Sequence, residues 1–295
     1  MVGARGFEPP TSASRTLNFE AKGINKINLA ELSNWYLTDR INTKGLTHSS
    51  QVTIERHFRH LLQDFETLPN SLQLSEWLGK RSLGARKRLF ETYRAFGRWL
   101  EKKKVIRNPW SDIDIPRVPV PLLKAPSPKN VAELFTYLDN HYPPELAMRN
   151  KAIIAVSVES GLRLFELSAI NLADINWSEQ TIRVWGKGQK EGKAPFGKTS
   201  ATLLKRWLAV HQGDGNIWGI DRAGVQVMLK RLHKATGIIC NPHSFRRAFA
   251  CLLRKQGLDC LTIKDLGRWE SLEMVQRYTR SITFQDSLKF YKGVL

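Results

Sequence analysis

The stretch LGRWESLEMVQRYT, residues 266–279, decides how the rest of the chain is interpreted. It places Tyr278 one helical turn after Met274, and Leu272 and Val275 mark an apolar helical face beside it. A tyrosine in such a pattern is often a buried core residue. The alternative is a tyrosine that performs chemistry, and other segments of the chain are needed to decide between the two.

The charge of the chain points to a polyanionic partner. Its 295 residues include 46 lysines and arginines against 27 aspartates and glutamates, which gives a formal net charge of +19 and a pI near 10.1. Such an excess is typical of proteins that bind nucleic acid. No lipidation motif or amphipathic anchor stands out, so nucleic acid fits better than a membrane surface.

Hydropathy and cysteine content exclude several classes of protein. With 42% hydrophobic residues, the chain can form two domain cores and does not have a disordered composition. No apolar run is long enough to cross a bilayer, and no signal-peptide pattern opens the sequence, so we expect a cytoplasmic protein. The three cysteines lack Cys-x-x-Cys spacing and predict neither a disulfide framework nor a zinc site.

A proline-rich segment divides the chain. Residues 108–130 hold six prolines, which remove backbone donors and disfavour helix. We therefore predict a linker at residues 114–128, between a helical domain at 25–113 and a second domain at 129–295. Residues 1–24 show no hydrophobic period, and we interpret them as a flexible leader.

The second domain combines helices with a small β-hairpin. TIRVW, residues 181–185, alternates and is β-branched, which predicts a strand. Gly186 and Gly188 interrupt it, and residues 194–196 are expected to return antiparallel. Helical patterns cover much of the remaining chain, including residues 162–172. The predicted fold class is mainly α, with a small β-hairpin or sheet in the second domain.

A predicted helix at residues 83–103 has a strongly basic face. Its apolar side lies opposite four cationic residues, Lys87, Arg94, Arg98 and Lys102. Between residues 80 and 107 there are eleven basic residues and two acidic ones. A solvated face usually mixes its signs, so this face predicts contact with phosphates, and simple solubility is the alternative.

Three further segments complete the pattern around Tyr278. They are GLRLFEL at 161–167, GKGQKEGKAP at 186–195 and PHSFRRAFA at 242–250, the last with His-x-x-Arg spacing. The candidate catalytic set, in chain order, is Arg163, Lys187, His243, Arg246, Trp269 and Tyr278. In order, spacing and local context this set resembles the tyrosine recombinase family, which includes phage integrases and Xer-like site-specific recombinases.

The resemblance implies a DNA strand transferase with a helical core-binding domain and a catalytic domain. Tyr278 would attack a DNA phosphate and form a 3′-phosphotyrosyl link, which keeps the phosphodiester energy. Arg163 and Arg246 would clamp the non-bridging oxygens with bidentate hydrogen bonds. His243 would assist proton transfer, and Trp269 would donate its indole N–H beside the phosphate.

A lysine on the hairpin turn would protonate the leaving 5′-oxygen. Lys187 matches the family position, and Lys190 and Lys193 are the nearby rivals. This chemistry needs no metal and no other cofactor, and no Asp/Glu cluster in the sequence offers a metal site.

Three charged residues are candidates for support of the site. Glu166, one turn after Arg163, matches an acidic family position that could orient a clamp arginine, although an ordinary surface ion pair is the alternative. Arg247 stands where the family often has histidine, which adds charge near the site. Arg268 stands in LGR-Trp where LGH is common, and it is a candidate for contact with phosphate.

The resemblance also implies partners. The partner would be double-stranded DNA at attachment sites, with two protomers on each site and four in a synapse that exchanges strands through a Holliday junction. Without DNA we expect a monomer or a weak oligomer. The segment after Tyr278, SITFQDSLKFYKGVL, has apolar residues that would dock on a neighbouring protomer or pack on its own domain.

The leader suggests a target. GFEP, residues 6–9, can be encoded by GGN-TTY-GAR-CCN, which admits GGTTCGAACC, a sequence that resembles the T-arm of a tRNA gene. We therefore hypothesise a mobile-element integrase, of a virus or a plasmid, whose attachment site overlaps the start of its own gene. An ordinary leader or an upstream start codon is the alternative.

Two other function classes compete with an integrase. One is a catalytically idle DNA-binding relative, which would be free to lose any member of the candidate set. The other is a type IB topoisomerase, which uses similar phosphotyrosyl chemistry; the short chain and the motif spacing disfavour it.

Overall fold

The computed structural model describes residues 28–114, 118–119, 124–186, 191–211 and 215–291. The chain divides into two compact units, Met1–Val120 and Pro121–Leu295, each with its own hydrophobic core. The boundary lies within the segment at 114–128 that the sequence marks as a linker. The leader at 1–24 lies outside the described residues.

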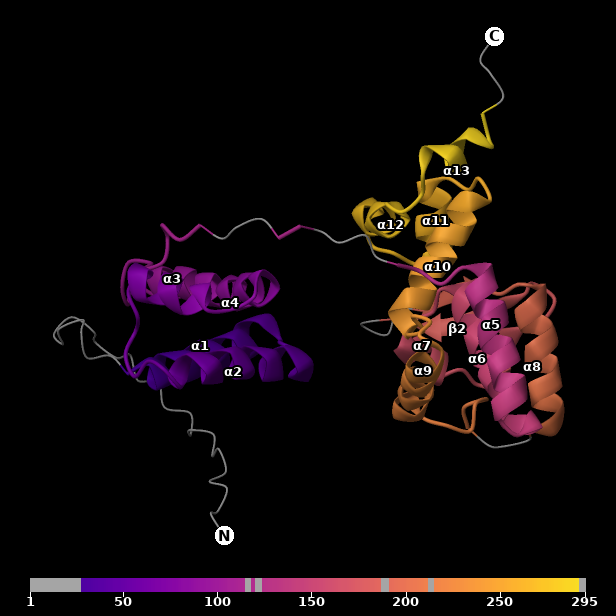
Figure 1. The fold of residues 1–295 in the computed structure, drawn as a ribbon. Helices are drawn as coiled ribbons and strands as arrows, with labels where there is room; N and C mark the ends of the chain where they lie inside the picture. The colour runs from indigo at the N-terminus through magenta and orange to yellow at the C-terminus, as the bar shows by residue number, and fades with distance from the viewer. Residues whose placement is uncertain (1–27, 115–117, 120–123, 187–190, 212–214, 292–295) are drawn as a thin grey trace. The chain divides into compact units, whose positions relative to one another are not determined.

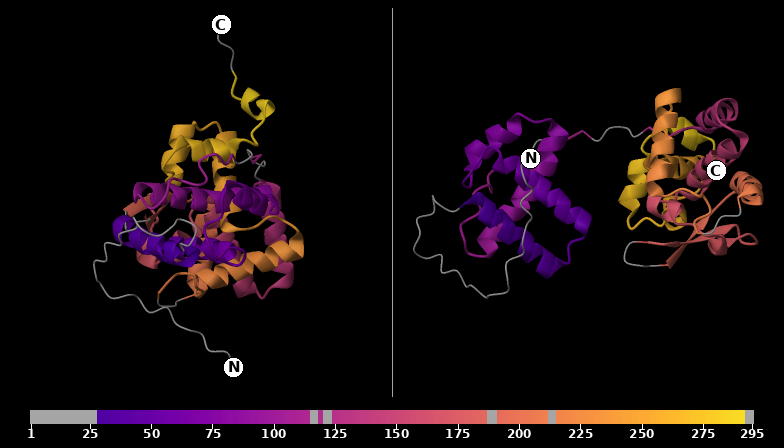
Figure 2. Two further views of the ribbon diagram at one scale, coloured as in Figure 1. Left: turned by 90° about the vertical axis from the view of Figure 1, so that its left-hand side faces the viewer. Right: turned by 90° about the horizontal axis from the view of Figure 1, so that it is seen from below.

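The described part of the first unit consists of helices that pack around one another (Figures 1 and 2). They are α1 (Leu29–Lys44), α2 (His48–Leu62), α3 (Ser71–Gly79) and α4 (Leu83–Lys102). The sequence pattern did not reveal α3, because its nine residues are too few for a clear period. A capping box between Asn70 and Gln73 begins this helix.

Aromatic side chains fill the core of the first unit. Phe58 and Phe96 meet edge to face with ring centroids 5.0 Å apart. Trp110 is fully buried and donates its indole N–H to the carbonyl of Pro69 at 2.9 Å. Helix α4 directs its apolar side into this core and leaves four cationic side chains exposed: Lys87, Arg94, Arg98 and Lys102.

The second unit carries the remaining elements. They are α5 (Pro128–His141), α6 (Pro144–Ser160), α7 (Leu164–Ser168), the 3-10 helix η2 (Leu172–Asp174), β1 (Ile175–Asn176), β2 (Thr181–Trp185), β3 (Glu191–Pro195), α8 (Lys198–Val210), α9 (Arg222–Thr236), α10 (Pro242–Lys255), α11 (Cys260–Gly267), α12 (Leu272–Thr279) and α13 (Phe284–Leu288). This confirms a mainly helical fold with a small antiparallel sheet of strand order β1-β2-β3.

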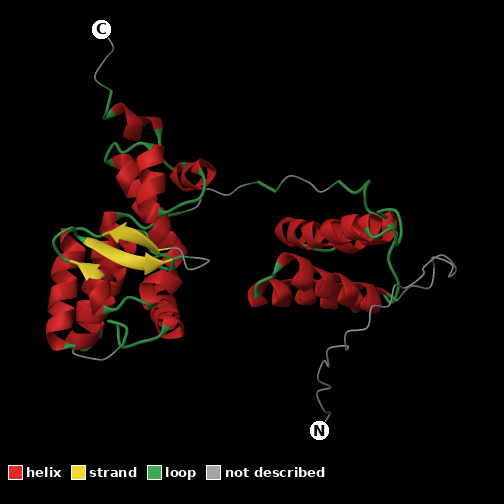
Figure 3. Cartoon of the chain, turned by 180° about the vertical axis from the view of Figure 1, so that it is seen from behind, coloured by secondary structure: helices red, strands yellow, loops and turns green. Residues whose placement is uncertain are grey.

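Helix α6 is the central element of the second unit. It is buried on nearly every side and packs against α5, α8, α10 and β3. Figure 3 shows the three strands, in yellow, lying against helices of this unit. Helices α10, α11 and α12 pack against one another and form a smaller apolar cluster of their own (Figure 1). Arg246, Trp269 and Tyr278 lie in or against this smaller cluster, and Arg246 reaches the end of α6 at Gly161.

Two sequence expectations are corrected by the structure. The expected helix at 162–172 is interrupted: α7 covers only Leu164–Ser168, because Arg163 is extended and caps it. The returning strand at 194–196 begins earlier, at Glu191, and Ile182 pairs with Ala194. Within the described residues, no helix is both long and apolar enough to cross a membrane.

Candidate active site

The end of α6 positions the first candidate arginine. Gly161 ends this helix with φ +59°, a conformation that favours glycine, and an added Cβ would lie 2.5 Å from the ring of Phe249. The chain then turns, and Arg163 caps α7 with its side chain partly exposed. Its guanidinium Nη1 lies 2.8 Å from Oε1 of Glu166. One terminal nitrogen of the Arg163 guanidinium is therefore held by Glu166, while part of the side chain remains exposed to solvent.

Glu166 is the buried acid of the site. Its side chain is 1% exposed, and Oε2 accepts hydrogen bonds from the Arg163 backbone N–H at 2.9 Å and from Arg268 Nη2 at 3.1 Å. Burial raises the pKa of Glu166, but the Arg163 backbone hydrogen bond and the charges of Arg268 and Arg163 outweigh it and hold the pKa below its ordinary value. The carboxylate is thus a charged bridge between two arginines.

Arg246, on α10, is the buried arginine. Only 3% of it is exposed. Its Nη1 donates to the carbonyl of Gly161, and its Nη2 donates to the carbonyl of Gly267 at 2.6 Å. Burial, then the charges of Arg163 and Arg268, lower its pKa to about 10, so it remains a cation at neutral pH.

The indole ring of Trp269 packs against the guanidinium of Arg246. The guanidinium carbon of Arg246 lies 4.5 Å from the centre of the indole, a cation–π contact. An added Cβ at Gly267 would approach the indole to 1.9 Å, so only glycine fits there. The indole N–H is buried and finds no acceptor among the described residues. A buried donor without a partner is uncommon, and the expected hydrogen bond of this indole to a phosphate stays a prediction.

Tyr278, on α12, lies edge-on to Trp269 with ring centroids 5.7 Å apart. It is half-buried against the small cluster of α10–α12, so it is neither a core tyrosine nor a fully exposed one. Its backbone carbonyl accepts from the thiol of Cys251 at 3.2 Å. Within the described part of the chain its hydroxyl has no hydrogen-bond partner. The phenol is left available for a substrate.

Arg268 uses its guanidinium within the protein. Nη2 reaches Glu166, and Nη1 lies 3.2 Å from the carbonyl of Leu266 and 3.4 Å from that of Lys193. Burial lowers its pKa, the charge of Glu166 raises it, and the net direction is down. Contact with phosphate, the role expected from sequence, is not what these donors serve here.

The remaining candidates of α10 differ in their surroundings. His243 is exposed in the first turn of the helix, which Asn241 caps. It precedes Arg246 by three residues and therefore shares its face of the helix. Arg247 instead donates to the carbonyl of Lys124 at 3.1 Å, so its side chain ties α10 to the end of the linker.

Two groups of predicted residues lie outside the part of the second unit that the structure describes. Lys187 and its rival Lys190 lie outside the described residues, on the turn between β2 and β3. The other rival, Lys193, pairs with Glu179 at 3.0 Å. The cationic residues of α4 belong to the first unit, which is described by itself. Among the described residues no group of three or more His, Cys, Asp or Glu could hold a metal ion.

Sequence reasoning missed three residues that shape the site. Gly161 and Gly267 supply the carbonyls that hold Arg246, and Cys251 holds the backbone of Tyr278. Gly161 directly precedes the Leu-Arg pair and Gly267 directly precedes Arg268, so glycine next to a candidate residue was a usable signal. Cys251 was expected to be a small buried hydrophobe; it is buried, but no sequence signal marked its hydrogen bond.

Known proteins resemble this chain in sequence and in fold. Residues 127–283 match the model of the phage integrase family. The chain is 32% identical to the tyrosine recombinase XerC of Alcanivorax borkumensis over 79% of this chain and 78% of that protein. It is 26% identical to the XerC of Syntrophus aciditrophicus over 83% and 90% of the two chains.

Solved structures share the fold at low sequence identity. The integrase of the Tn1549 transposon, in complex with transposon right end DNA, superposes with a TM-score of 0.71 at 16% identity and covers 89% of this chain and 98% of its own. A lambda integrase dimer bound to a COC′ core site gives a TM-score of 0.72 at 14% identity, with 92% and 81% covered.

Proposed function

The chain belongs to the phage integrase family and is a site-specific recombinase, and from this premise we propose that it cuts and rejoins double-stranded DNA through Tyr278. The observation that carries the proposal is the meeting of two arginines, an indole and a phenol. Arg163, Arg246, Trp269 and Tyr278 span more than 100 residues of the sequence and lie near one another in a single unit.

The reaction proposed for this site is a transesterification. The Tyr278 oxygen bonds to phosphorus, the bond to the 5′-oxygen breaks, and a 3′-phosphotyrosyl link remains. Arg163 and Arg246 stabilise the charge that builds on the non-bridging oxygens, and the free indole N–H of Trp269 adds a donor. The exposed imidazole of His243 exchanges the phenol proton, and Lys187 gives a proton to the leaving oxygen. Attack by the freed 5′-hydroxyl of another strand reverses these steps.

The first unit is proposed to bind the DNA backbone outside the reacting phosphate. Lys87, Arg94, Arg98 and Lys102 are exposed along one side of α4, opposite its buried face. Such a row of cations releases counterions from DNA and gives binding that weakens with salt. We propose that the protein acts as four protomers on two DNA sites, through a Holliday junction, in the cytoplasm.

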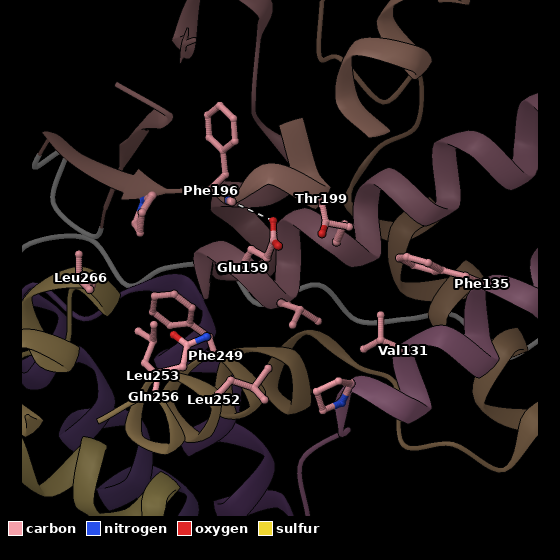
Figure 4. A pocket seen from close by; sticks show the side chains of 15 residues that line it. Val131, Phe135, Glu159, Phe196, Thr199, Phe249, Leu252, Leu253, Gln256 and Leu266 are labelled. Atoms are coloured by element: carbon pink, nitrogen blue, oxygen red, sulfur yellow. Dashed lines mark hydrogen bonds between the residues drawn. The ribbon is translucent and has the colours of Figure 1, made fainter. Parts of the chain in front are cut away.

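A groove in the second unit supports assembly between protomers. It has a volume of 480 Å³ and is lined mainly by apolar side chains, among them Val131, Phe135 and Phe249, with Glu159 at one side (Figure 4). Helix α13 contacts its own unit through the ion pair of Lys255 with Asp286 at 3.2 Å. It leaves Phe284 75% exposed, an apolar side chain suited to such a groove on a neighbour.

Integration of a mobile element is the finer proposal. It is supported by the GFEP leader, whose codons admit a tRNA T-arm, and by the likeness to a transposon integrase. The second candidate is resolution of chromosome dimers, favoured by the relatives named XerC. The nucleotide sequence separates the two: codons at residues 6–9 that are incompatible with a T-arm remove the tRNA-gene target.

The test of the proposed function is a cleavage assay on nicked duplexes that trap the covalent adduct. Wild type is compared with Tyr278→Phe on a candidate tRNA-gene site and on randomised sites. Tyr291→Phe is the matched control, because Tyr291 is 65% exposed outside the site. We expect an adduct with wild type and the control, and binding without adduct for Tyr278→Phe.

Each other outcome identifies a competing function. Binding without adduct by wild type on all sites indicates the idle DNA-binding relative. Relaxation of supercoiled DNA without site preference indicates the topoisomerase-like activity.

A further inference from the structure

Arg268 occupies a backbone position that favours glycine. It ends α11 with φ 54° and ψ 45°, the left-handed region. Among the described residues, the other non-glycine residues with positive φ are Lys104 and Gln180. An L-residue in this region is strained, because its Cβ crowds the following carbonyl oxygen, and glycine avoids this strain. A side chain retained at such a position calls for a reason.

The side chain of Arg268 joins three segments of the second unit. It is 15% exposed and contacts Glu166 on α7, the Lys193 carbonyl on β3 and the Leu266 carbonyl on its own helix. Gly192, also on β3, leaves room for it, because an added Cβ there would lie 3.1 Å from the Arg268 Cδ. The surroundings therefore satisfy the two terminal nitrogens of this guanidinium, while its buried Nε has no hydrogen-bond partner among the described residues.

Glu166 has two opposing effects on the proposed arginine clamp, and the positive charge of Arg268 compensates for one of them. Glu166 orients Arg163 through its Oε1, but a buried carboxylate also cancels the positive charge of that arginine. With Arg163, Glu166 and Arg246 alone, the cluster would carry one net positive charge. Arg268 pairs with the second carboxylate oxygen and raises the net charge to two. Attack of a phenolate on a phosphodiester builds two negative charges at phosphorus, so the larger charge matches the transition state.

We propose that Arg268 is a positioning residue that fixes Glu166 and restores the positive charge of the clamp, without touching the phosphate itself. This rests on the proposed phosphotyrosyl reaction. This role explains why an arginine stands at a backbone position suited to glycine. It also means that Glu166 can orient Arg163 without lowering the net positive charge available to the phosphate. It also gives the strand β3 a direct link to the clamp, through the carbonyl of Lys193.

The backbone conformation gives an unusually clean variant. Arg268→Gly removes the guanidinium and relieves the left-handed strain, so the fold keeps its turn. Gln180→Gly is the matched control, because Gln180 has φ 52° in the same unit and relieves strain away from the site. Arg268→Lys keeps a charge but loses the planar fork that reaches three oxygens.

The test measures single-turnover cleavage at saturating protein on two nicked substrates. One carries an ordinary scissile phosphate and the other a neutral methylphosphonate, whose transition state bears one negative charge less. We expect Arg268→Gly to cleave the phosphate roughly 10- to 100-fold more slowly than wild type, and the methylphosphonate only a few-fold more slowly. Arg268→Lys should recover part of the loss, and Gln180→Gly should match wild type on both. Thermal unfolding of Arg268→Gly should occur at a lower temperature than that of wild type, because Glu166 loses a buried partner, so cleavage is compared at a temperature at which both proteins are folded.

Three outcomes would overturn the assignment. Equal losses on both substrates would indicate a purely structural role, and no loss on either would remove any role. A loss as large as that of Arg163→Ala on the phosphate would identify a direct phosphate contact. Failure of wild type to form any adduct is a different result: it would remove the proposed reaction itself, and the role of Arg268 with it.

Discussion

The proposed arginine clamp and the proposed nucleophile are held by the fold in contrasting ways. Arg246 is almost completely buried, is held by carbonyls from two distant segments, and rests on an indole. Tyr278 is half-buried on a short helix, in a cluster much smaller than the main core, and its side chain touches mainly one ring. The contrast separates two proposed tasks: the arginine proposed to stabilise charge is rigidly held, and the phenol proposed to react lies on a short helix with a smaller apolar cluster beneath it.

This difference predicts where substitutions act. Changes around Arg246 should lower both the stability of the fold and the rate of cleavage, because its donors satisfy buried carbonyls. Changes around Tyr278 should lower the rate with little effect on stability. The four variants below test that separation, in order of decreasing effect on the rate.

Arg246→Lys is expected to have the largest effect. Lysine keeps the charge but cannot reach both carbonyls and a phosphate, so cleavage should fall by roughly 10³-fold. Unfolding in urea should show a loss of about 2 kcal/mol. Arg254→Lys, on the same helix, is the control, since Arg254 bonds only to a nearby carbonyl at 3.2 Å. Retention of wild-type stability by Arg246→Lys would contradict the anchoring role.

Gly267→Ala probes the contact between helix and indole. The added methyl would overlap the Trp269 ring, so the indole must shift. This shift changes the ring surface on which the Arg246 guanidinium packs. A displacement near 1 Å lowers the rate by about 10²-fold. Gly79→Ala is the control, because a Cβ there meets nothing within 4 Å. An unchanged rate would show that the position of Trp269 is not critical. Circular dichroism and single-turnover cleavage give the two readouts.

Glu166→Gln should slow cleavage by about tenfold, because it loses a charged hydrogen bond to each arginine. It also carries a pH signature. The folded pKa of Glu166 lies below its ordinary value, so its stabilisation is present at neutral pH and is lost as the carboxylate is protonated. The difference in unfolding free energy between wild type and Glu166→Gln should therefore shrink below a pH of about 4.3. A difference that stays constant in acid would contradict the charged bridge.

Cys251→Val is expected to have the smallest effect. Valine fills the buried space but removes the donor to the Tyr278 carbonyl, a weak hydrogen bond worth below about 1 kcal/mol. Cleavage should fall a few-fold, and Cys251→Ser, which keeps a donor, should recover it. Equal rates for the valine and serine variants would show that the thiol does not position α12.

The sequence indicated candidate residues but not how the fold holds them. Arg246, Trp269 and Tyr278, which the sequence pattern singled out, do lie against one another, while their catalytic roles stay predictions. Arg268 shows the limit: from the sequence it was a candidate for contact with phosphate, and no local pattern indicated its backbone conformation. In fact the arginine itself takes the left-handed conformation. Such choices depend on packing between distant segments, which local pattern does not contain.

Secondary structure shows the same limit in the second unit. The β-branched run at 181–185 predicted β2 correctly, because alternation is a local property. The run at 162–172 has helical periodicity but breaks, since Arg163 must be extended for Glu166 to reach its backbone N–H. The contacts that require an extended Arg163 therefore outweighed the helix propensity of the neighbouring residues.

The two carbonyls that hold Arg246 also set an order of events during synthesis. Gly161 lies 85 residues before Arg246, and Gly267 lies 21 residues after it. Contacts so distant in sequence form late, because the intervening chain must be ordered first. On the ribosome, a chain that has not yet exposed Gly267 and Tyr278 can fold its first unit but holds no assembled centre. The proposed site is therefore complete only after the chain has been synthesised through Tyr278.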